Sequence, residues 1–394
     1  MTAHSENKQA TLPRFRKQTY EIGSQAPDFD EAALEVTRAL IGLDFRAARA
    51  TLDISEDVCR DYCNYMGSRN PLFLSQDYGR TSRWGGMLAP PTMVGVAITA
   101  PGLRGVQWIA GSRGWEWYRP IRPGDRIVQR GKYTGWEVKR GRHANTFAIQ
   151  YGQLECHNEQ RELVARGFVS YIRTARAGSR NAMRFEPRRK TWTPEEVQEF
   201  VEARRRETIR GAEIRYWEDV SVGDRIGPVV YGPLRLTDIA LTGAFNDSGA
   251  LHGEGLAHLG AHYYQLENRR RHPADSFLNE ETGVHDHPHR GHWEPHMATQ
   301  VGMPGMYDVG NQRATWFCRL VTDWMGDDAF VEQLNARLVR PNVVSDVNWV
   351  EGVVEAKEQG EHGPVVRCRL VARNQLDETT MDGVARVRLL SKEM

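Results

Sequence analysis

Two side chains that exchange protons near neutral pH stand in the run 246–252, NDSGALH. Asp247 and His252 lie five positions apart, mostly with small residues between them, so no bulky side chain keeps the two polar groups from one water molecule. Aspartate and histidine commonly act as acid or base at this pH. We interpret the pair as a candidate for activating water. The simpler alternative is that Asp247 caps a helix or turn and His252 is a solvated loop residue.

Composition limits the kind of protein that can carry this pair. The chain has 394 residues, of which 40% are hydrophobic and 26% are charged, enough for two or three soluble domains. Lys+Arg 52 against Asp+Glu 51 gives a net charge of +1, so no basic excess favours nucleic acid. Proline and glycine interrupt the apolar stretch 87–103, which excludes a membrane span. The five cysteines form no CxxC pair, and we expect a reduced, cytoplasmic protein.

The first half of the chain reads as a helical part followed by a sheet. After a polar arm, the patterns predict a strand at 45–54, a helix capped by Ser55, and a buried helix with Pro91 in its first turn. Strand-like runs separated by turn residues follow at 115–125, 126–136, 143–156 and 163–172. A charged linker with one surface helix is expected at 174–215.

The second half shows the same order of parts. A strand–turn–strand signature is expected at 216–226, then the run 246–252 and a helix at 257–271. Helical periodicity returns at 309–325. Four further strand-like runs close the chain, at 333–340, 347–356, 365–372 and 384–390.

Two landmarks indicate that the halves are copies of one unit. The run 119–125, RPIRPGD, corresponds to 340–346, RPNVVSD, and each precedes a strand. The run 67–73, GSRNPLF, corresponds to 246–252. Ser68 and Phe73 therefore stand where the second half has Asp247 and His252. The sequence predicts an internal duplication of a helix-plus-antiparallel-sheet domain.

Both halves resemble the MaoC-like (R)-specific enoyl-CoA hydratase family, whose motif is Gly-Asp-x-Asn-Pro-Leu-His. The second half keeps the Asp and His of that motif but has Gly249-Ala250 in place of Asn-Pro. The first half keeps Asn70-Pro71-Leu72 but has Ser68 and Phe73 at the Asp and His positions. The resemblance implies an α+β fold, a tandem (double) hotdog, in which each antiparallel sheet wraps around a long central helix. The expected parts are an arm at 1–40, a degenerate hotdog at 41–178, a linker at 179–215, and a catalytic hotdog at 216–394 with a His-rich insertion at 272–300.

The resemblance also implies an activity. Asp247 and His252 would hold the water that adds to a 2-enoyl-CoA, or leaves a 3-hydroxyacyl-CoA in the reverse direction. The degenerate half would give room to a bulky acyl chain. The substrate would be an acyl-CoA thioester, without cofactor, metal, nucleic acid or membrane. We expect a homodimer, because hotdog sheets commonly pair edge to edge or bury their helix faces together.

The same resemblance implies a substrate-binding site at the start of the central helix of the second half. Backbone N–H groups there would stabilise the thioester oxygen, at residues where the family usually has His-Gly. Here the sequence has Tyr307 and Asp308, followed by Val309 and Gly310, and Arg313 lies one turn into the helix. For Asp308 we favour capping of the helix over direct contact with substrate. For Arg313 we favour a structural pair with Asp308 over contact with substrate.

A His-rich segment, 285–296 (HDHPHRGHWEPH), carries five histidines. A metal site is conceivable, because imidazole and carboxylate groups suit zinc. Pro288 and Gly291 break any helical spacing, so we favour a loop over the mouth of the active site. Two alternatives to the hydratase stay open: a hotdog acyl-CoA thioesterase, and a non-catalytic acyl-CoA-binding subunit of a hydratase complex.

Overall fold

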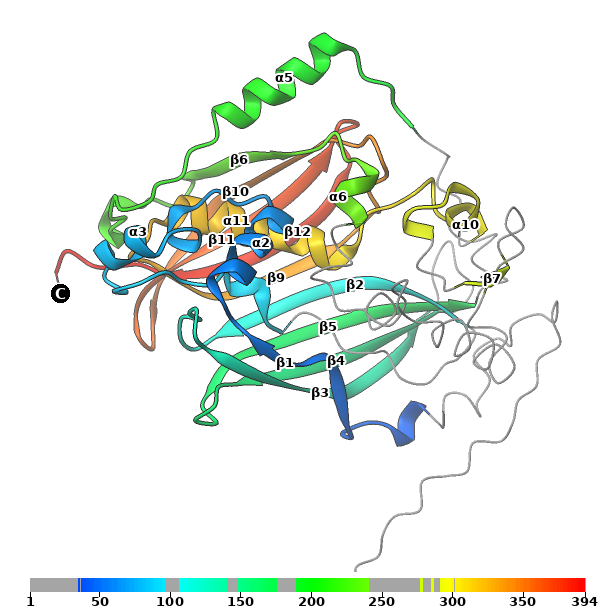
Figure 1. The fold of residues 1–394 in the computed structure, drawn as a ribbon, viewed down its shortest axis with the longest axis horizontal. Helices are drawn as coiled ribbons and strands as arrows, with labels where there is room; N and C mark the ends of the chain where they lie inside the picture. Colours follow the sequence, from blue (N-terminus) through cyan, green and yellow to red (C-terminus); the bar gives the residue numbers. More distant parts are fainter. Residues whose placement is uncertain are drawn as a thin grey trace, which may run out of the picture.

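The computed structural model describes residue 35 and residues 37–95, 106–139, 147–175, 189–240, 277–278, 285–286, 291–300 and 302–393. Figure 1 shows these parts as two groups of strands that meet along one line, with helices packed between and around them. Asp247, His252 and the helix expected at 257–271 lie outside the described residues.

Each half of the chain contributes five strands to one ten-stranded sheet. The first half supplies β1 (Asp44–Asp53), β2 (Val106–Trp117), β3 (Arg126–Lys139), β4 (Phe147–His157) and β5 (Leu163–Ala175). The second half supplies β6 (Arg225–Tyr231), β9 (Phe330–Leu338), β10 (Asn348–Gly360), β11 (Gly363–Asn374) and β12 (Thr379–Arg388). The short β7 (Phe277–Leu278) and β8 (His285–Asp286) pair with each other, apart from the large sheet.

The strand order is a palindrome of two equivalent sets. It runs β1-β3-β4-β5-β2-β9-β12-β11-β10-β6, and every neighbouring pair is antiparallel. Each strand of the first half thus has a counterpart at the mirrored place in the order. The two halves join where β2 pairs with β9. This order confirms a tandem antiparallel architecture and agrees with the duplication expected from the sequence.

The register at the β2–β9 junction shows how the halves are related. The alignment that matches Arg119 with Arg340 also matches Gly114 with Asn335, and these two residues are paired across the junction. Ser112 pairs with Arg337, and by the same alignment Gln333 pairs with Glu116. A pseudo-two-fold axis therefore passes through the Gly114–Asn335 pair.

Both halves of the chain and the linker contribute helices. The first half has α2 (Glu56–Met66), η1 (Pro71–Phe73), α3 (Gln76–Thr81) and η2 (Pro91–Met93); the linker and second half have α5 (Pro194–Arg205), η3 (Trp217–Asp219), α6 (Leu236–Ala240), α10 (Pro295–Gln300) and α11 (Gly310–Met325). Ser55 caps α2, as expected, by accepting a hydrogen bond from the Val58 N–H. Among the described helices, none is long and apolar enough to cross a membrane.

The long helix α11 forms the centre of the second half. All of its residues except Trp324 are buried, and it packs on β9, β6, β2 and α2. Buried apolar side chains from both halves of the ten-stranded sheet and from α11 belong to one core cluster. In Figure 1 α5 lies outside this core, beyond β6, and its buried Phe200 contacts Trp192 and Trp349.

The runs 119–125 and 340–346, which precede β3 and β10, form turns with the same hydrogen bonds. Asp125 accepts a hydrogen bond from the Arg122 N–H at 2.9 Å, and Asp346 accepts one from the Val343 N–H at 2.9 Å. The shared aspartate is therefore conserved between the halves because its carboxylate closes the turn that starts the strand.

Two expectations from the sequence were wrong in detail. The strand expected at 115–125 is β2, which begins at Val106 and ends at Trp117, because Pro120 and Pro123 cannot donate to a ladder. The strand–turn–strand expected at 216–226 contains the 3₁₀ turn η3 before β6. Pro91 does open a helical turn, the 3₁₀ turn η2, and residues 96–105 after it lie outside the described residues.

Candidate active site

The start of α11 is the described segment of the second half where the sequence predicts a substrate-binding site. Val309 is the N-cap residue and makes no side-chain capping bond. The N-terminal N–H groups of a helix have no intrahelical acceptor, and they carry a partial positive charge. Such a helix start can stabilise negative charge that develops on a carbonyl oxygen.

Gly310 brings the first turn of α11 into close contact with both halves. A Cβ atom built on Gly310 would lie 2.6 Å from the Ala110 Cβ of β2 and 2.4 Å from the Leu338 Cδ1 of β9. These separations are shorter than van der Waals contact, so only glycine fits. The helix start therefore lies directly at the junction of the two halves, where β2 and β9 are paired.

Asp308 anchors the loop that leads to β10. Its carboxylate accepts hydrogen bonds from the Asn342 N–H at 3.2 Å and the Asn342 Nδ2 at 2.9 Å, and its own N–H donates to the Asn342 carbonyl at 2.9 Å. Burial raises the pKa of Asp308, and Arg313 opposes this rise. The carboxylate thus points to Asn342, and the expected capping of α11 falls to Val309 instead. The Asp308 N–H is therefore occupied within the protein, whereas the first N–H groups of α11 have no intrahelical acceptor.

Arg313 forms the expected ion pair with Asp308. Its Nε lies 3.2 Å from the Asp308 carboxylate, and both side chains are buried. Its Nη1 donates to the backbone carbonyls of Arg340 and Thr380. The guanidinium therefore ties the first turns of α11 to the chain around β9 and β12.

Tyr307 faces the His-rich segment. Its ring centroid lies 4.1 Å from that of His292, and its carbonyl oxygen lies 2.8 Å from the His292 Nδ1. Gly291 and Ala298 also pack beside Tyr307. The described end of the His-rich segment therefore lies against the residues that precede α11. No group of three or more metal-binding side chains is present among the described residues.

Gln312 connects α11 with the helix that leads toward the run 246–252. Its Nε2 donates to the Asp238 carbonyl of α6 at 2.8 Å. In the first half, Tyr62 of α2 donates to the Thr92 carbonyl of η2 at 2.7 Å. A side-chain-to-backbone hydrogen bond therefore connects α11 with α6 in the second half and α2 with η2 in the first half.

The motif of the first half is fully described and shows what Asn-Pro does. Asn70 accepts a hydrogen bond from the Leu72 N–H at 3.0 Å, and Pro71 opens the turn η1. The Leu72 carbonyl then accepts from the Leu88 N–H at 3.0 Å, and this brings Phe73 into a buried cluster with Leu88. The run 246–252 has Gly249 at the capping position, which offers no side-chain acceptor.

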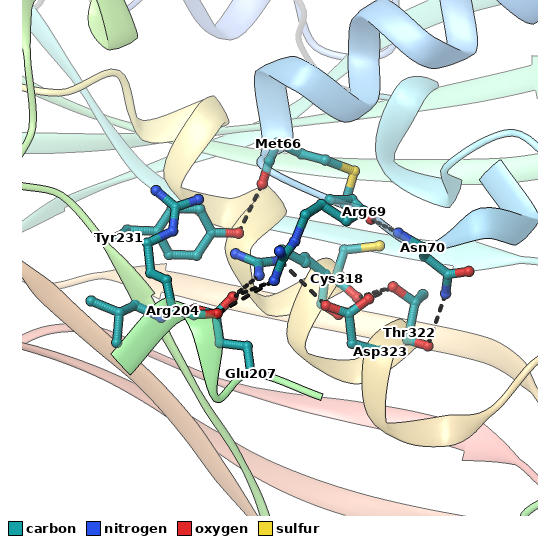
Figure 2. Close-up of polar contacts among 12 residues, drawn as sticks. Met66, Arg69, Asn70, Arg204, Glu207, Tyr231, Cys318, Thr322 and Asp323 are labelled. Atoms are coloured by element: carbon teal, nitrogen blue, oxygen red, sulfur yellow. Dashed lines mark hydrogen bonds and ion pairs between the residues drawn. The ribbon is translucent and has the colours of Figure 1, made fainter. Parts of the chain in front are cut away.

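A cluster of buried charges lies where this first-half motif meets α11 (Figure 2). Arg319 of α11 forms ion pairs with Glu207 of the linker and, at 3.3 Å, with Asp323 one turn on. The three side chains are 1%, 2% and 3% exposed. Arg69 of the motif lies 3.9 Å from Glu207. Burial raises the pKa of Asp323 to about 7, although Arg319 opposes the rise.

A cavity opens beside the same motif. It is lined by Asn70, Phe73, Trp117 and Phe330, among other mainly apolar side chains, and it offers about 30 Å³ to the centres of water-sized molecules. That volume holds about two waters. The cavity beside the first-half motif is therefore small, and the room for a bulky acyl chain that the resemblance implies in this half stays a prediction.

The sequence comparisons give a match within the first half. Residues 39–166 match the family model of the FAS1-like dehydratase domain region. No curated protein matches the sequence significantly.

The solved structures identify the fold of the whole chain. A MaoC-like dehydratase is 14% identical, with a TM-score of 0.61 over 90% of this chain and 100% of that one. A conserved hypothetical protein from Mycobacterium tuberculosis, described as having a double hotdog fold, is 14% identical, with a TM-score of 0.53 over 89% and 97%. A putative MaoC domain protein dehydratase from Chloroflexus aurantiacus is 12% identical, with a TM-score of 0.52 over 89% and 95%.

These matches confirm the tandem hotdog fold and the resemblance to the MaoC-like hydratases and dehydratases. The chain thus has the double-hotdog fold of the MaoC-like dehydratases, and residues 39–166 match the dehydratase family model itself.

Proposed function

We propose that the protein adds water to a 2-enoyl-CoA, or removes it from a 3-hydroxyacyl-CoA, with Asp247 and His252 as the water-activating pair. The water oxygen bonds to the β-carbon, one of the two side chains takes the proton released by the water, and the other delivers a proton to the α-carbon. Negative charge accumulates meanwhile on the thioester oxygen. The start of α11 supplies the positive end of a helix for that oxygen.

One observation carries the proposal: the hydrogen bond from Leu88 to Leu72 in the first half. It holds Phe73 in a buried cluster with Leu88, three residues before Pro91 opens η2. The duplication relates Leu72 and Phe73 to Leu251 and His252, and it relates Leu88 to Val309. A second half built on the same contact would hold His252 beside the start of α11, at the oxygen-stabilising end of the helix.

The test is an absorbance assay of enoyl-thioester loss across short, branched and polycyclic CoA esters. We expect hydration by the wild type, and loss of about 10³-fold or more in kcat for Asp247→Asn and for His252→Gln, since each removes a proton-transfer group. Ser68→Ala, at the position equivalent to Asp247, serves as the matched control and should keep its activity. Equal activity of Asp247→Asn and the wild type would reject the proposal.

The same reaction mixtures test the two alternatives. A thioesterase would release free CoA thiol, which a thiol reagent detects, without hydrating the double bond. A non-catalytic acyl-CoA-binding subunit would bind the enoyl-CoA but turn none over, and Asp247→Ala would leave that binding unchanged.

A further inference from the structure

A buried arginine of the first half reaches the first turn of α11. Arg113 lies on β2 next to the pseudo-two-fold pair, and it is 3% exposed. Its Nε donates to the Asn311 side chain, the second residue of α11. Its Nη1 donates to the carbonyls of Ser112 at 2.7 Å and Ser170 at 3.3 Å. The guanidinium is thus held in a fixed position at the start of the helix.

Within the described chain, no carboxylate lies within ion-pair distance of Arg113. The Tyr171 ring lies beneath its guanidinium at 4.8 Å, and the hydroxyls of Tyr65 and Tyr171 are the groups that favour its charge. Burial lowers the pKa of Arg113, so holding this cation here has a cost. The buried arginines Arg313 and Arg319 of α11 each have an acidic partner, unlike Arg113 of β2.

The duplication shows that the fold does not need a cation at this position. The alignment of Arg119 with Arg340 relates Arg113 to Leu334 of β9. Leu334 is fully buried in the apolar core. Leu334 lies on β9 of the second half, so an apolar side chain fills this position in one half and an arginine fills it in the other. Arg113, the residue at this position on β2, is the one that hydrogen-bonds to the start of α11.

We propose that Arg113, contributed by the first half, stabilises the negative charge that forms on the thioester oxygen of a substrate bound at the start of α11. The inference rests on the proposed hydratase function and adds a charged group from the other half to its site. A cation that has no counter-ion among the described residues, held beside a helix start, raises the local positive potential. That potential acts on the enolate-like state more than on the neutral thioester.

The direct test uses acetoacetyl-CoA, whose α-protons are acidic and whose enolate absorbs in the near ultraviolet. We expect the wild-type protein to raise the enolate fraction of the bound probe at neutral pH. Arg113→Leu, which installs the residue of the equivalent position, should lower that enolate-to-keto ratio by about tenfold or more. Arg113→Lys should keep most of it, because the charge remains. Calorimetry confirms that each variant binds the probe, and circular dichroism confirms that it folds.

Arg173→Met is the matched control, since Arg173 is also buried in the first-half sheet but bonds to Gln150 rather than to α11. It should keep the enolate signal. An equal enolate fraction in Arg113→Leu and the wild type, or no enolate enrichment by the wild type, would overturn the role of Arg113.

Turnover gives an independent readout on the same variants. Arg113→Leu should lower kcat for hydration about 10- to 100-fold with little change in KM, because the charge acts on the transition state. A raised KM with unchanged kcat would also overturn the proposal. Failure of the hydratase function is recognised separately, by Asp247→Asn matching the wild type, and the enolate measurement does not depend on that turnover.

Discussion

At the scale of single residues, Asp308 and Arg313 form the buried ion pair on which the start of α11 depends. Both side chains are at most 5% exposed, and the carboxylate also holds Asn342. We predict that Asp308→Ala lowers the free energy of unfolding by about 3–5 kcal/mol, because it leaves the Arg313 charge buried without its partner. Urea denaturation followed by circular dichroism measures this loss.

An exposed pair provides the control for that substitution. Asp377 lies 3.3 Å from Arg373 and is 87% exposed, so Asp377→Ala should cost about 1 kcal/mol or less. The double variant Asp308→Ala/Arg313→Met should recover part of the loss, since it removes the stranded charge. A small effect of Asp308→Ala on stability with a large rise in KM would instead mean that Asp308 binds substrate.

The residues of the candidate site differ in how far the sequence could predict them. The pairing of Asp308 with Arg313 follows from their spacing at a helix start. The contact of Asp308 with Asn342 does not, because it joins two loops through the tertiary fold. Arg113 was missed, although extending the alignment of Arg119 with Arg340 by six positions contrasts it with Leu334. Asp247 and His252 stay predictions.

At the scale of elements, the position of α11 depends on close packing at Gly310. We predict that Gly310→Ala destabilises the protein by about 1–3 kcal/mol, because the new Cβ would collide with Ala110 and Leu338. Relieving the collision shifts the helix start, so kcat for the proposed hydration should fall as well. Denaturation and steady-state kinetics on the same preparation measure both effects.

Gly135→Ala is the matched control, since a Cβ at Gly135 on β3 meets nothing within 4 Å. It should leave stability within about 0.5 kcal/mol and kcat unchanged. If Gly310→Ala behaves like this control, the helix start has more freedom than its contacts indicate.

The elements that the sequence predicted well are those with a strong local signal. The helix expected at 309–325 is α11, because its apolar periodicity is long and Gly326 ends it in a positive-φ conformation. The beginning of β2 was missed, because residues 106–114 contain two glycines and three polar residues in positions that hide the strand alternation. Their strand conformation comes from pairing with β5 and β9, which are distant in sequence.

At the scale of the whole molecule, the duplication was predictable, but the charged cluster beside the first-half motif was not. Two short landmarks related the halves, and the strand order is symmetric about their junction. No sequence spacing indicated that Glu207 of the linker would reach Arg319 and Asp323 of α11, beside the first-half motif (Figure 2). This cluster joins three separate segments, so it bears on the stability of the entire chain.

We predict that Asp323 makes this stability depend on pH. Burial raises its pKa from 3.8 to about 7 on folding, so the native state binds the proton more tightly than the unfolded state. Its favourable contribution is complete below pH 3.8 and is lost as the pH rises through about 7. The free energy of unfolding should therefore fall by an amount on the order of 3 kcal/mol between about pH 4 and pH 8 on account of this residue.

Other carboxylates also titrate in this range, so the informative quantity is the difference between the wild type and Asp323→Asn. Asparagine keeps the shape and cannot ionise, and Arg319 keeps Glu207 as its counter-ion. The variant should gain stability relative to the wild type as the pH is raised from 5 to 8 in urea denaturation. Asp382→Asn, which alters a pair with the exposed Arg337, should show no such trend. A difference between wild type and Asp323→Asn that stays constant across this range would show that Asp323 is ionised throughout, held so by Arg319.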